Sequence, residues 1–201
     1  NRANSVRFAG CAVFAESGTT IENLITMSRD RELSVLEHFV GIPSTVGGAI
    51  RQNIHFLSPD RKSTLFIDSV VESATVLTED NQIKSVNHDY FHFGYDDSIL
   101  HHKNIVVLDV TFLLTPRDKS QIQAQMDANM AWRIAKQPQL WDFPSCGSVF
   151  KKIADVGAGR LIDQAGLKGF TIGGAQVSDK HANYIVNLGH ATSADIESVI
   201  Q

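Results

Sequence analysis

The hydrophobic positions change their spacing once along the chain, near residue 115. Before that point the apolar residues occur in short runs rich in Val, Ile, Thr and Phe, and breaks such as Glu79-Asp80-Asn81 separate the runs. Runs of this kind predict β-strands joined by hairpins, here over residues 6–12, 67–78, 82–86 and 104–114. A helix is predicted over residues 20–28, with Thr19 or Thr20 as its N-cap.

From Ser120 onward the apolar residues recur at a helical period. Four of them lie roughly one turn apart: Ile122, Met126, Met130 and Ile134. This spacing predicts a helix that ends before Pro138. Further helices are predicted over residues 155–168, where Gly169 supplies the C-terminal glycine, and over residues 192–201. The chain is therefore expected to be a mixed α+β protein.

Composition and charge exclude several classes of protein. The chain has 201 residues, 43% of them hydrophobic and 20% charged, with a formal net charge of −4, which is typical of one or two globular domains. Its basic residues are scattered, so no nucleic-acid partner is expected. Its apolar runs are too short to span a bilayer, and residues 1–15 do not resemble a signal peptide, so a cytoplasmic location is expected. Cys11 and Cys146 lie far apart and are expected to be reduced, and no metal site is expected.

A glycine-rich loop from Gly41 to Asn53 carries a first chemical signal. Within it, Ser44 and Thr45 offer hydroxyls, and Gly47-Gly48 would let backbone amides approach a ligand without a Cβ in the way. Successive exposed amides suit a pyrophosphate, particularly where a helix begins nearby. The loop matches neither the Gly-Lys-Ser/Thr phosphate loop nor the Gly-x-Gly-x-x-Gly fingerprint. A tight strand-to-helix turn that needs glycine explains the same residues equally well.

Three dense blocks in the last third of the chain carry a second signal. The first is Ser145-Cys146-Gly147-Ser148-Val149-Phe150-Lys151, and the others occupy residues 158–169 and 172–183. Together they place serine hydroxyls, three lysines and a histidine among glycines that include the pair Gly173-Gly174. Three such blocks in a fixed order are unlikely to recur by chance, so they indicate an enzyme family.

Together these motifs resemble the UDP-N-acetylenolpyruvoylglucosamine reductases, also called UDP-N-acetylmuramate dehydrogenases, which are flavoenzymes of peptidoglycan precursor synthesis. The resemblance runs from about Val6 to the end and includes three further features: Glu37-x-x-Val40-Gly41-Ile42-Pro43, Phe93-Gly94-Tyr95, and Arg133 with Gln137-Pro138. It implies that residues 1–114 are the second subdomain of a split FAD-binding domain of the vanillyl-alcohol-oxidase-like type. Residues 115–201 would then be an α/β substrate-binding domain.

The resemblance also implies a reaction and its cofactors. With FAD and NADPH, such an enzyme reduces UDP-N-acetylglucosamine enolpyruvate to UDP-N-acetylmuramate. Hydride passes from flavin N5 to the enolpyruvyl β-carbon, and a protein acid protonates the α-carbon. The partner implied is thus a small UDP-sugar, while the oligomeric state is left open.

Individual residues of this chain match functional positions of that family. Ser148 matches the proton-donating serine, and a hydroxyl fixed within about 3 Å of a carbanion can protonate it. Residues that match substrate contacts are Tyr95, Lys136, Lys168 and His181. Residues that match the flavin-binding loop are Gly41, Ile42, Ser44, Thr45, Gly47, Gly48, Gln52 and Asn53, the last two through their side-chain amides. Without the resemblance, such a serine, lysine or histidine is usually a loop hydroxyl, a surface charge or a structural residue.

The sequence also departs from the family pattern. Where the family has Tyr-Arg-x-Ser, with the arginine gripping the enolpyruvyl carboxylate, this chain has Tyr95-Asp96-Asp97-Ser98. An acid at Asp96 is expected to weaken substrate binding unless another cation moves in. The small-residue turn that follows Asn53 in the family is here Ile54-His55-Phe56-Leu57, and Ser44 and Lys152-Ile153 also differ.

Two alternatives remain open at this stage. The chain is expected to lack an N-terminal FAD subdomain and a C-terminal segment with a catalytic glutamate, and together with Asp96 this favours a non-catalytic relative as the first alternative. Such a relative would keep the fold and a UDP-sugar or partner site without flavin. The second alternative is a different flavin oxidoreductase that shares the cofactor domain alone, and the substrate-side blocks weigh against it.

Overall fold

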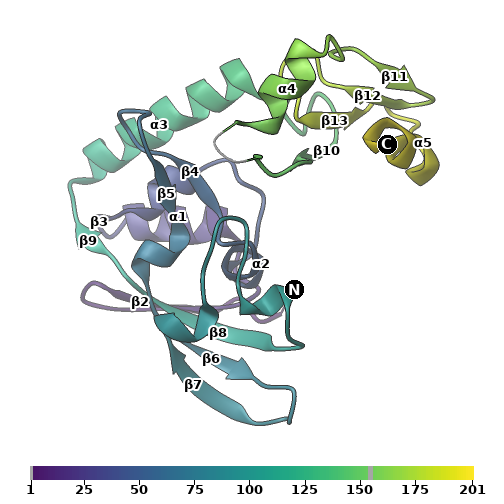
Figure 1. The fold of residues 1–201 in the computed structure, drawn as a ribbon. Coiled ribbons are helices and arrows are strands. Elements are labelled where there is room, and N and C mark those ends of the chain that lie inside the picture. The colour runs from purple at the N-terminus through teal and green to yellow at the C-terminus, as the bar shows by residue number, and fades with distance from the viewer. Residues whose placement is uncertain (1, 154–155) are drawn as a thin grey trace. The chain divides into compact units, whose positions relative to one another are not determined.

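The computed structural model describes residues 2–153 and 156–201, which form two compact units (Figure 1). The units are Asn1–Met130 and Ala131–Gln201. The division falls inside the long helix α3 (Lys119–Lys136), which confirms the helix predicted from Ser120 to Pro138. Within the described residues no helix combines the length and the apolar character needed to cross a membrane.

An antiparallel five-stranded sheet forms the centre of the first unit (Figure 1). Its strands, in spatial order, are β1 (Val6–Ala9), β2 (Ala12–Glu16), β8 (Val106–Leu113), β6 (Val71–Leu77) and β7 (Ile83–Asn87). The strands predicted over residues 67–78, 82–86 and 104–114 are confirmed as β6, β7 and β8, although a 3-10 turn precedes β6. The predicted run 6–12 instead turns back at Gly10, where φ is +60°, and forms a hairpin with β2.

Two short helices complete the core of the first unit. Helix α1 (Ile21–Arg29) begins after Thr20, whose Oγ1 accepts a hydrogen bond from the Asn23 amide at 3.2 Å, which confirms the predicted cap. Helix α2 (Val46–Gln52) packs against strands β2 and β8. The interior contains Leu24, Phe39, Ile50 and Phe112, each 0% exposed. Burying a side chain of this size contributes about 1.5–3 kcal/mol, so these contacts fix α2 on the sheet.

Smaller elements connect these parts. They are β3 (Leu33–Ser34) paired with β9 (Thr115–Pro116), β4 (His55–Leu57) paired with β5 (Thr64–Phe66), and the 3-10 turns η1 (Leu36–Phe39), η2 (Ile67–Val70), η3 (His88–Phe91) and η4 (Ile99–His101).

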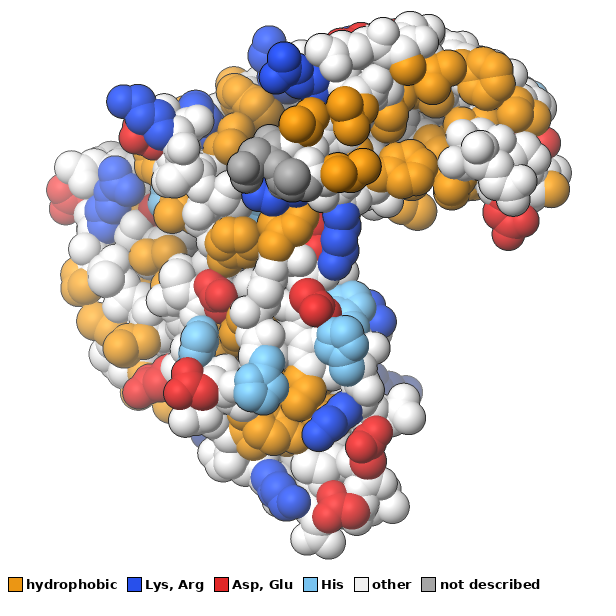
Figure 2. Space-filling model, viewed as in Figure 1, with side chains coloured by type: hydrophobic (Ala, Val, Ile, Leu, Met, Phe, Trp, Pro, Cys, Tyr) orange, Lys and Arg blue, Asp and Glu red, His pale blue; other side chains and the backbone are white. Residues whose placement is uncertain are grey.

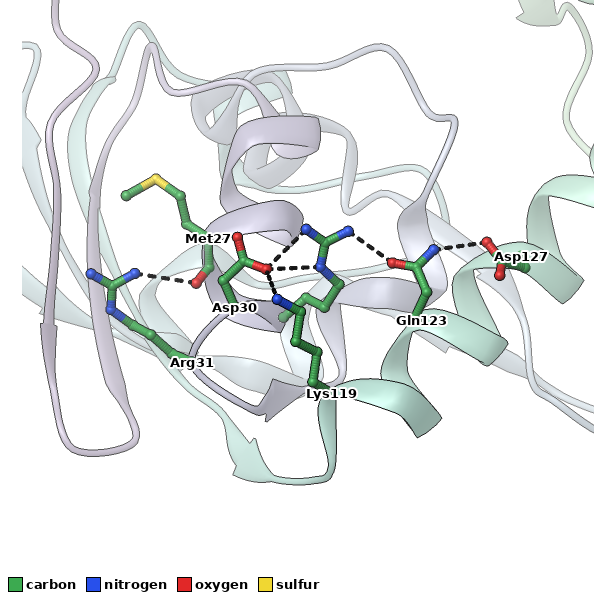
Figure 3. A network of polar contacts seen from close by, with 7 residues as sticks. Met27, Asp30, Arg31, Lys119, Gln123 and Asp127 are labelled. Atoms are coloured by element: carbon green, nitrogen blue, oxygen red, sulfur yellow. Dashed lines mark hydrogen bonds and ion pairs between the residues drawn. The ribbon is translucent and has the colours of Figure 1, made fainter.

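A polar network joins the end of α1 to the start of α3 (Figure 3). The Asp30 carboxylate pairs with Lys119 at 2.8 Å and with Arg29 at 2.9 Å. These two partners, Lys119 first, hold the pKa of Asp30 below its usual value. The Arg29 guanidinium also donates to Gln123 at 2.8 Å, and Gln123 donates to Asp127 at 2.8 Å. These contacts hold the first turns of α3 against the end of α1.

The second unit is built on a four-stranded antiparallel sheet. Its strands, in spatial order, are β10 (Ser145–Ser148), β13 (Tyr184–Asn187), β12 (Ala175–Val177) and β11 (Thr171–Ile172). Helix α5 (Ser193–Ile200) packs against β11 and β12, and a capping box between Thr192 and Asp195 begins it, so the helix predicted over residues 192–201 is confirmed. Helix α4 (Ala158–Gln164) is shorter than the helix predicted over residues 155–168, whose first residue lies outside the described residues.

Close packing explains the paired glycines of the third sequence block. A Cβ on Gly174 would lie 2.7 Å from the Ala191 Cα, and a Cβ on Gly173 would lie 2.6 Å from the Asp195 carboxylate. The Gly174 amide donates to this carboxylate at 3.3 Å. The turn between β11 and β12 therefore contacts the start of α5 without room for side chains, and these glycines have a structural role.

We expect the substitution Gly174→Ala to lower the free energy of unfolding by about 1–3 kcal/mol, because the added methyl overlaps the backbone at Ala191. Urea unfolding followed by tryptophan fluorescence measures this directly, since both tryptophans, Trp132 and Trp141, belong to the second unit. Gly157→Ala is the matched control, because its Cβ meets nothing within 4 Å. Equal stability of the two variants would contradict the packing argument.

Candidate functional site

The glycine-rich loop of the first unit folds as a tight entry into α2. The amides of Val46 and Gly47 donate to the Thr19 and Ser17 carbonyls, each at 2.8 Å, and the Gly48 amide donates to Thr45 Oγ1 at 3.3 Å. The amides of Gly47 and Gly48, which were expected to be available to a ligand, are thus hydrogen-bonded within the protein. A Cβ on Gly47 would lie 3.2 Å from the Ser17 Cβ, so the strand-to-helix turn itself needs this glycine.

The outer surface of this loop carries few side chains. Gly41 is exposed in the left-handed region, with φ at +77°, and Gly48 is also exposed. A Cβ on Gly48 would lie 3.0 Å from the Ser44 hydroxyl and would cover it. The Ser44 and Thr45 hydroxyls are half-buried beside these glycines: Ser44 Oγ donates to the Thr45 carbonyl at 3.0 Å, and Thr45 Oγ1 accepts from the Gly48 amide. Ile42 and Gln52 are also half-buried.

Asn53 ends α2 in the left-handed region, with φ at +46°, and is 1% exposed. Its side-chain Nδ2 donates to the Gly94 carbonyl at 3.0 Å and to Asp68 at 3.1 Å, and its Oδ1 accepts from the Asp68 amide at 3.2 Å. The amide of Asn53 is thus engaged inside the protein, which differs from the predicted contact with a cofactor. Its contacts connect the glycine-rich loop to the turn that carries Tyr95.

The turn over residues 94–98 is fixed to the end of α2. The Gly94 amide donates to the Asp97 carbonyl at 3.0 Å, and the Ser98 hydroxyl, 1% exposed as a residue, donates to the Arg51 carbonyl at 2.8 Å. Tyr95, 38% exposed, therefore stands on an anchored turn. The structure brings this predicted substrate contact close to the glycine-rich loop.

His55 and Asp96, which both depart from the family pattern, contact each other. His55 Nδ1 lies 3.4 Å from Asp96 Oδ1, and the imidazole packs between the rings of Phe66 and Tyr95, with centroids 5.0 and 5.2 Å away. On the visible face of the first unit, histidine side chains lie among acidic ones (Figure 2). The position expected to hold an arginine therefore holds a carboxylate beside an imidazole.

Ser148 belongs to the second unit and ends strand β10. It lies opposite Tyr184 of β13, and the register shifts between Ser145 and Ser148, where Gly147 adopts a φ of +83°. Such an irregularity re-aims the side chain that follows it. Ser148 is exposed. After it, the Asn183 side chain accepts from the Phe150 amide at 3.0 Å and donates to the Phe150 carbonyl at 2.8 Å.

His181 and Lys168 lie in the same unit and interact electrostatically. Burial lowers the pKa of His181, and the positive charge of Lys168 lowers it further. His181 Nδ1 accepts from the Asn183 amide at 3.3 Å, which assigns the ring proton of the neutral histidine to Nε2. Lys168 pairs with Asp163 at 3.1 Å, whereas Lys136 is exposed in the last turn of α3.

Tyr184 lies beside Ser148 and His181, and sequence reasoning did not select it. It is 7% exposed, and its ring lies 4.7 Å from that of His181. Burial raises the pKa of the Tyr184 phenol, while the Arg133 charge and a hydrogen bond with the Ser148 side chain oppose this shift. Burial also disfavours the charged form of Arg133 and so lowers the pKa of its guanidinium. Tyr184 lies directly after the block over residues 172–183, and no sequence motif included it.

The part of the chain that the structure describes contains no candidate metal centre. Among residues 2–153 and 156–201, no three His, Cys, Asp or Glu side chains are arranged to hold a metal ion. Cys11 and Cys146 are free thiols.

Comparison with known proteins gives consistent results. Residues 137–201 match the family described as UDP-N-acetylenolpyruvoylglucosamine reductase, C-terminal domain. The reductases of that name from Limosilactobacillus reuteri and Lactiplantibacillus plantarum are 43% and 41% identical over 199 residues, 99% of this chain in each case. The solved structure of the Thermus caldophilus reductase is 30% identical with a TM-score of 0.81, and the match covers 93% of this chain and 66% of that one.

The matched region accounts for part of each relative. The chain spans 64% of the length of the L. reuteri reductase and 63% of that from L. plantarum. Identity near 40% across nearly all of this chain, together with a fold shared at a TM-score of 0.81, supports one family assignment. The chain belongs to the UDP-N-acetylenolpyruvoylglucosamine reductase family.

Proposed function

We propose that this chain provides the flavin-facing and substrate-binding parts of an NADPH-dependent reductase that converts UDP-N-acetylglucosamine enolpyruvate to UDP-N-acetylmuramate. The observation that carries the proposal is the grouping of Ser148, His181 and Lys168 in the second unit, inside the region that matches the reductase C-terminal domain. Tyr184 connects them: it pairs with Ser148 across the strands, its ring lies 4.7 Å from that of His181, and the charge of Lys168 acts on His181.

The residues present fit one side of a bound FAD. Exposed Gly41 and Gly48 flank the half-buried hydroxyls of Ser44 and Thr45, so a flat or phosphorylated group can approach the backbone closely at these two glycines. We infer that these residues, with Ile42, Gly47 and Gln52, would hold FAD. When bound, FAD supplies the hydride chemistry of the reaction. Asn53 acts on this surface from inside, through its contacts with Gly94 and Asp68.

The residues of the second unit suit the anionic substrate and the proton transfer. Lys168 and Lys136 offer ammonium groups for the diphosphate and the carboxylate, and the neutral His181 offers an Nε2–H donor. Ser148 carries its hydroxyl on an exposed strand end and would protonate the α-carbon. The Asn183 clamp on Phe150 fixes the backbone that positions this hydroxyl.

The first test is whether the purified protein binds flavin and uses it. We expect FAD to give a visible absorbance band that bleaches with NADPH and returns when the enolpyruvyl substrate is added. Flavin that bleaches but is not reoxidised by the substrate would indicate a different flavin oxidoreductase. A protein that stays colourless with excess FAD would favour a non-catalytic relative that keeps a UDP-sugar or partner site.

Ser148→Ala should leave the reduction of bound flavin by NADPH intact and lower the rate of substrate-dependent reoxidation by about a hundredfold or more, because the proton donor is lost. Stopped-flow measurement of the two half-reactions separates these steps. Ser145→Ala, which removes a hydroxyl from the same strand, is the matched control. Equal slowing of both half-reactions by Ser148→Ala would argue against a role confined to proton donation.

Asp96→Arg should tighten binding of the anionic substrate by about tenfold or more, if this position faces the substrate carboxylate, because arginine can form a bidentate pair with it. Titration of the reduced protein with substrate gives the affinity. Asp89→Arg changes the net charge equally and also removes an aspartate that pairs with a histidine, His88, so it controls for general electrostatics. An identical gain in both variants would refute a direct contact at Asp96.

A further inference from the structure

We propose that Tyr184 is a positioning residue that orients the Ser148 hydroxyl and returns a proton to it after each turnover. This inference rests on the proposed function, because it assigns the second proton donor behind the first. Tyr184 lies outside the three sequence blocks that carried the family resemblance, whereas Ser148 lies in the first of them.

The strand register places the two side chains together. Ser148 and Tyr184 are direct partners in the antiparallel pairing of β10 with β13, so both side chains project from the same face of the sheet. The Ser148 side chain lowers the pKa of the Tyr184 phenol, which agrees with two hydroxyl-bearing side chains that face each other across the strands. Because a hydroxyl can both donate and accept, the phenol can orient the serine oxygen in one state and pass it a proton in another.

The surroundings of Tyr184 hold its ring in one place. The phenol is buried, whereas Ser148 is exposed at the end of its strand. The His181 ring packs edge-on against the tyrosine at an interplanar angle of 60°. The exposed Ser148 hydroxyl is therefore paired with a Tyr184 hydroxyl that is fixed in place and desolvated.

The charges around the phenol suit proton release during turnover and not before it. Burial raises the pKa of Tyr184, which keeps the phenol protonated at neutral pH. From α3, Arg133 acts on Tyr184 with its positive charge and stabilises the phenolate. The other titratable group in ring contact is His181, whose pKa is lowered, and the nearby charge of Lys168 acts on it.

The proton transfers balance without an oxidant or a metal. The Ser148 O–H bond breaks as its proton forms the C–H bond at the substrate α-carbon, and the serine oxygen keeps the bonding electron pair. The Tyr184 O–H bond then breaks and its proton restores the serine hydroxyl. The electron pair stays on the phenolate beside Arg133 until water returns a proton.

The contact can be tested without any cofactor, by ¹⁹F NMR of the protein labelled with 3-fluorotyrosine. The chain has three tyrosines, Tyr90, Tyr95 and Tyr184, so single substitutions to phenylalanine assign the resonances. Because the Ser148 hydroxyl lowers the pKa of Tyr184, Ser148→Ala should raise the titration midpoint of the Tyr184 resonance alone. An unchanged midpoint, or the same change at all three tyrosines, would overturn the proposed contact.

The functional test uses the two half-reactions with Tyr184→Phe, which keeps the ring against His181. Reduction by NADPH should be unchanged, and reoxidation by substrate should slow by about 10- to 100-fold. The slow-down should be absent in a Ser148→Ala background, because a residue that acts through Ser148 adds nothing once that hydroxyl is gone. Tyr90→Phe, which removes a phenol hydroxyl from the first unit, should leave both rates unchanged.

The pH profile separates a proton role from a structural one. The donor is present below the folded-state pKa of Tyr184 and lost above it, so reoxidation should fall at alkaline pH in the parent protein. Tyr184→Phe should remove that alkaline fall. Unchanged rates and profile in this variant would overturn the inference, whereas absence of substrate-dependent reoxidation in the parent protein would refute the proposed function instead.

Discussion

Two asparagine side chains supply backbone hydrogen bonds at points where regular secondary structure stops, and both candidate groups depend on them. From the end of α2, Asn53 binds the Gly94 carbonyl and the Asp68 amide, and Asn183 binds the amide and carbonyl of Phe150 beyond β10. A buried backbone polar group without a partner costs free energy comparable to a lost hydrogen bond. An amide that both donates and accepts is therefore an efficient way to fix an irregular segment that carries function.

These clamps explain how the candidate functional side chains can lie on short, irregular segments that are nevertheless fixed. The Tyr95 turn is held by Asn53 and Ser98 to a helix whose apolar face is buried in the sheet. Ser148 lies between a backbone irregularity at Gly147 and the Asn183 clamp. In each unit the rigid part is the core, and the chemistry is placed at its edge, where a ligand can reach it.

Sequence reasoning predicted the elements whose signal is local. The Thr20 cap and the one-turn spacing from Ile122 to Ile134 gave α1 and α3, because caps and helical periods depend on neighbouring residues. The sheet of the second unit was not predicted, since strands as short as Thr171–Ile172 leave no alternation to detect. Long-range packing set the roles of the paired glycines, and neither Ser17 beside Gly47 nor Ala191 beside Gly174 is adjacent in sequence.

The same limit applies to the candidate site. Motif resemblance selected Ser148, Lys168 and His181, which the structure groups in one unit, but it gave no reason to choose Tyr184 or to expect His55 beside Asp96. Strand register brings Tyr184 beside Ser148, and the turn over residues 94–98 brings Asp96 beside His55, which is distant in sequence. Contacts of this kind depend on the fold as a whole, and a single sequence does not encode them in any short pattern.

Burial of the tyrosine has a consequence for how a proton donor at a surface can work. A serine hydroxyl exposed to water exchanges protons freely, so a ligand must cover it before a specific transfer to carbon is favoured. Covering Ser148 desolvates it, whereas Tyr184 is desolvated by the fold already. Part of the cost of a dry site is thus met before any ligand binds. The positive charge that lowers the pKa of the phenol comes from Arg133, a half-buried side chain of α3, so the fold supplies this electrostatic stabilisation in advance.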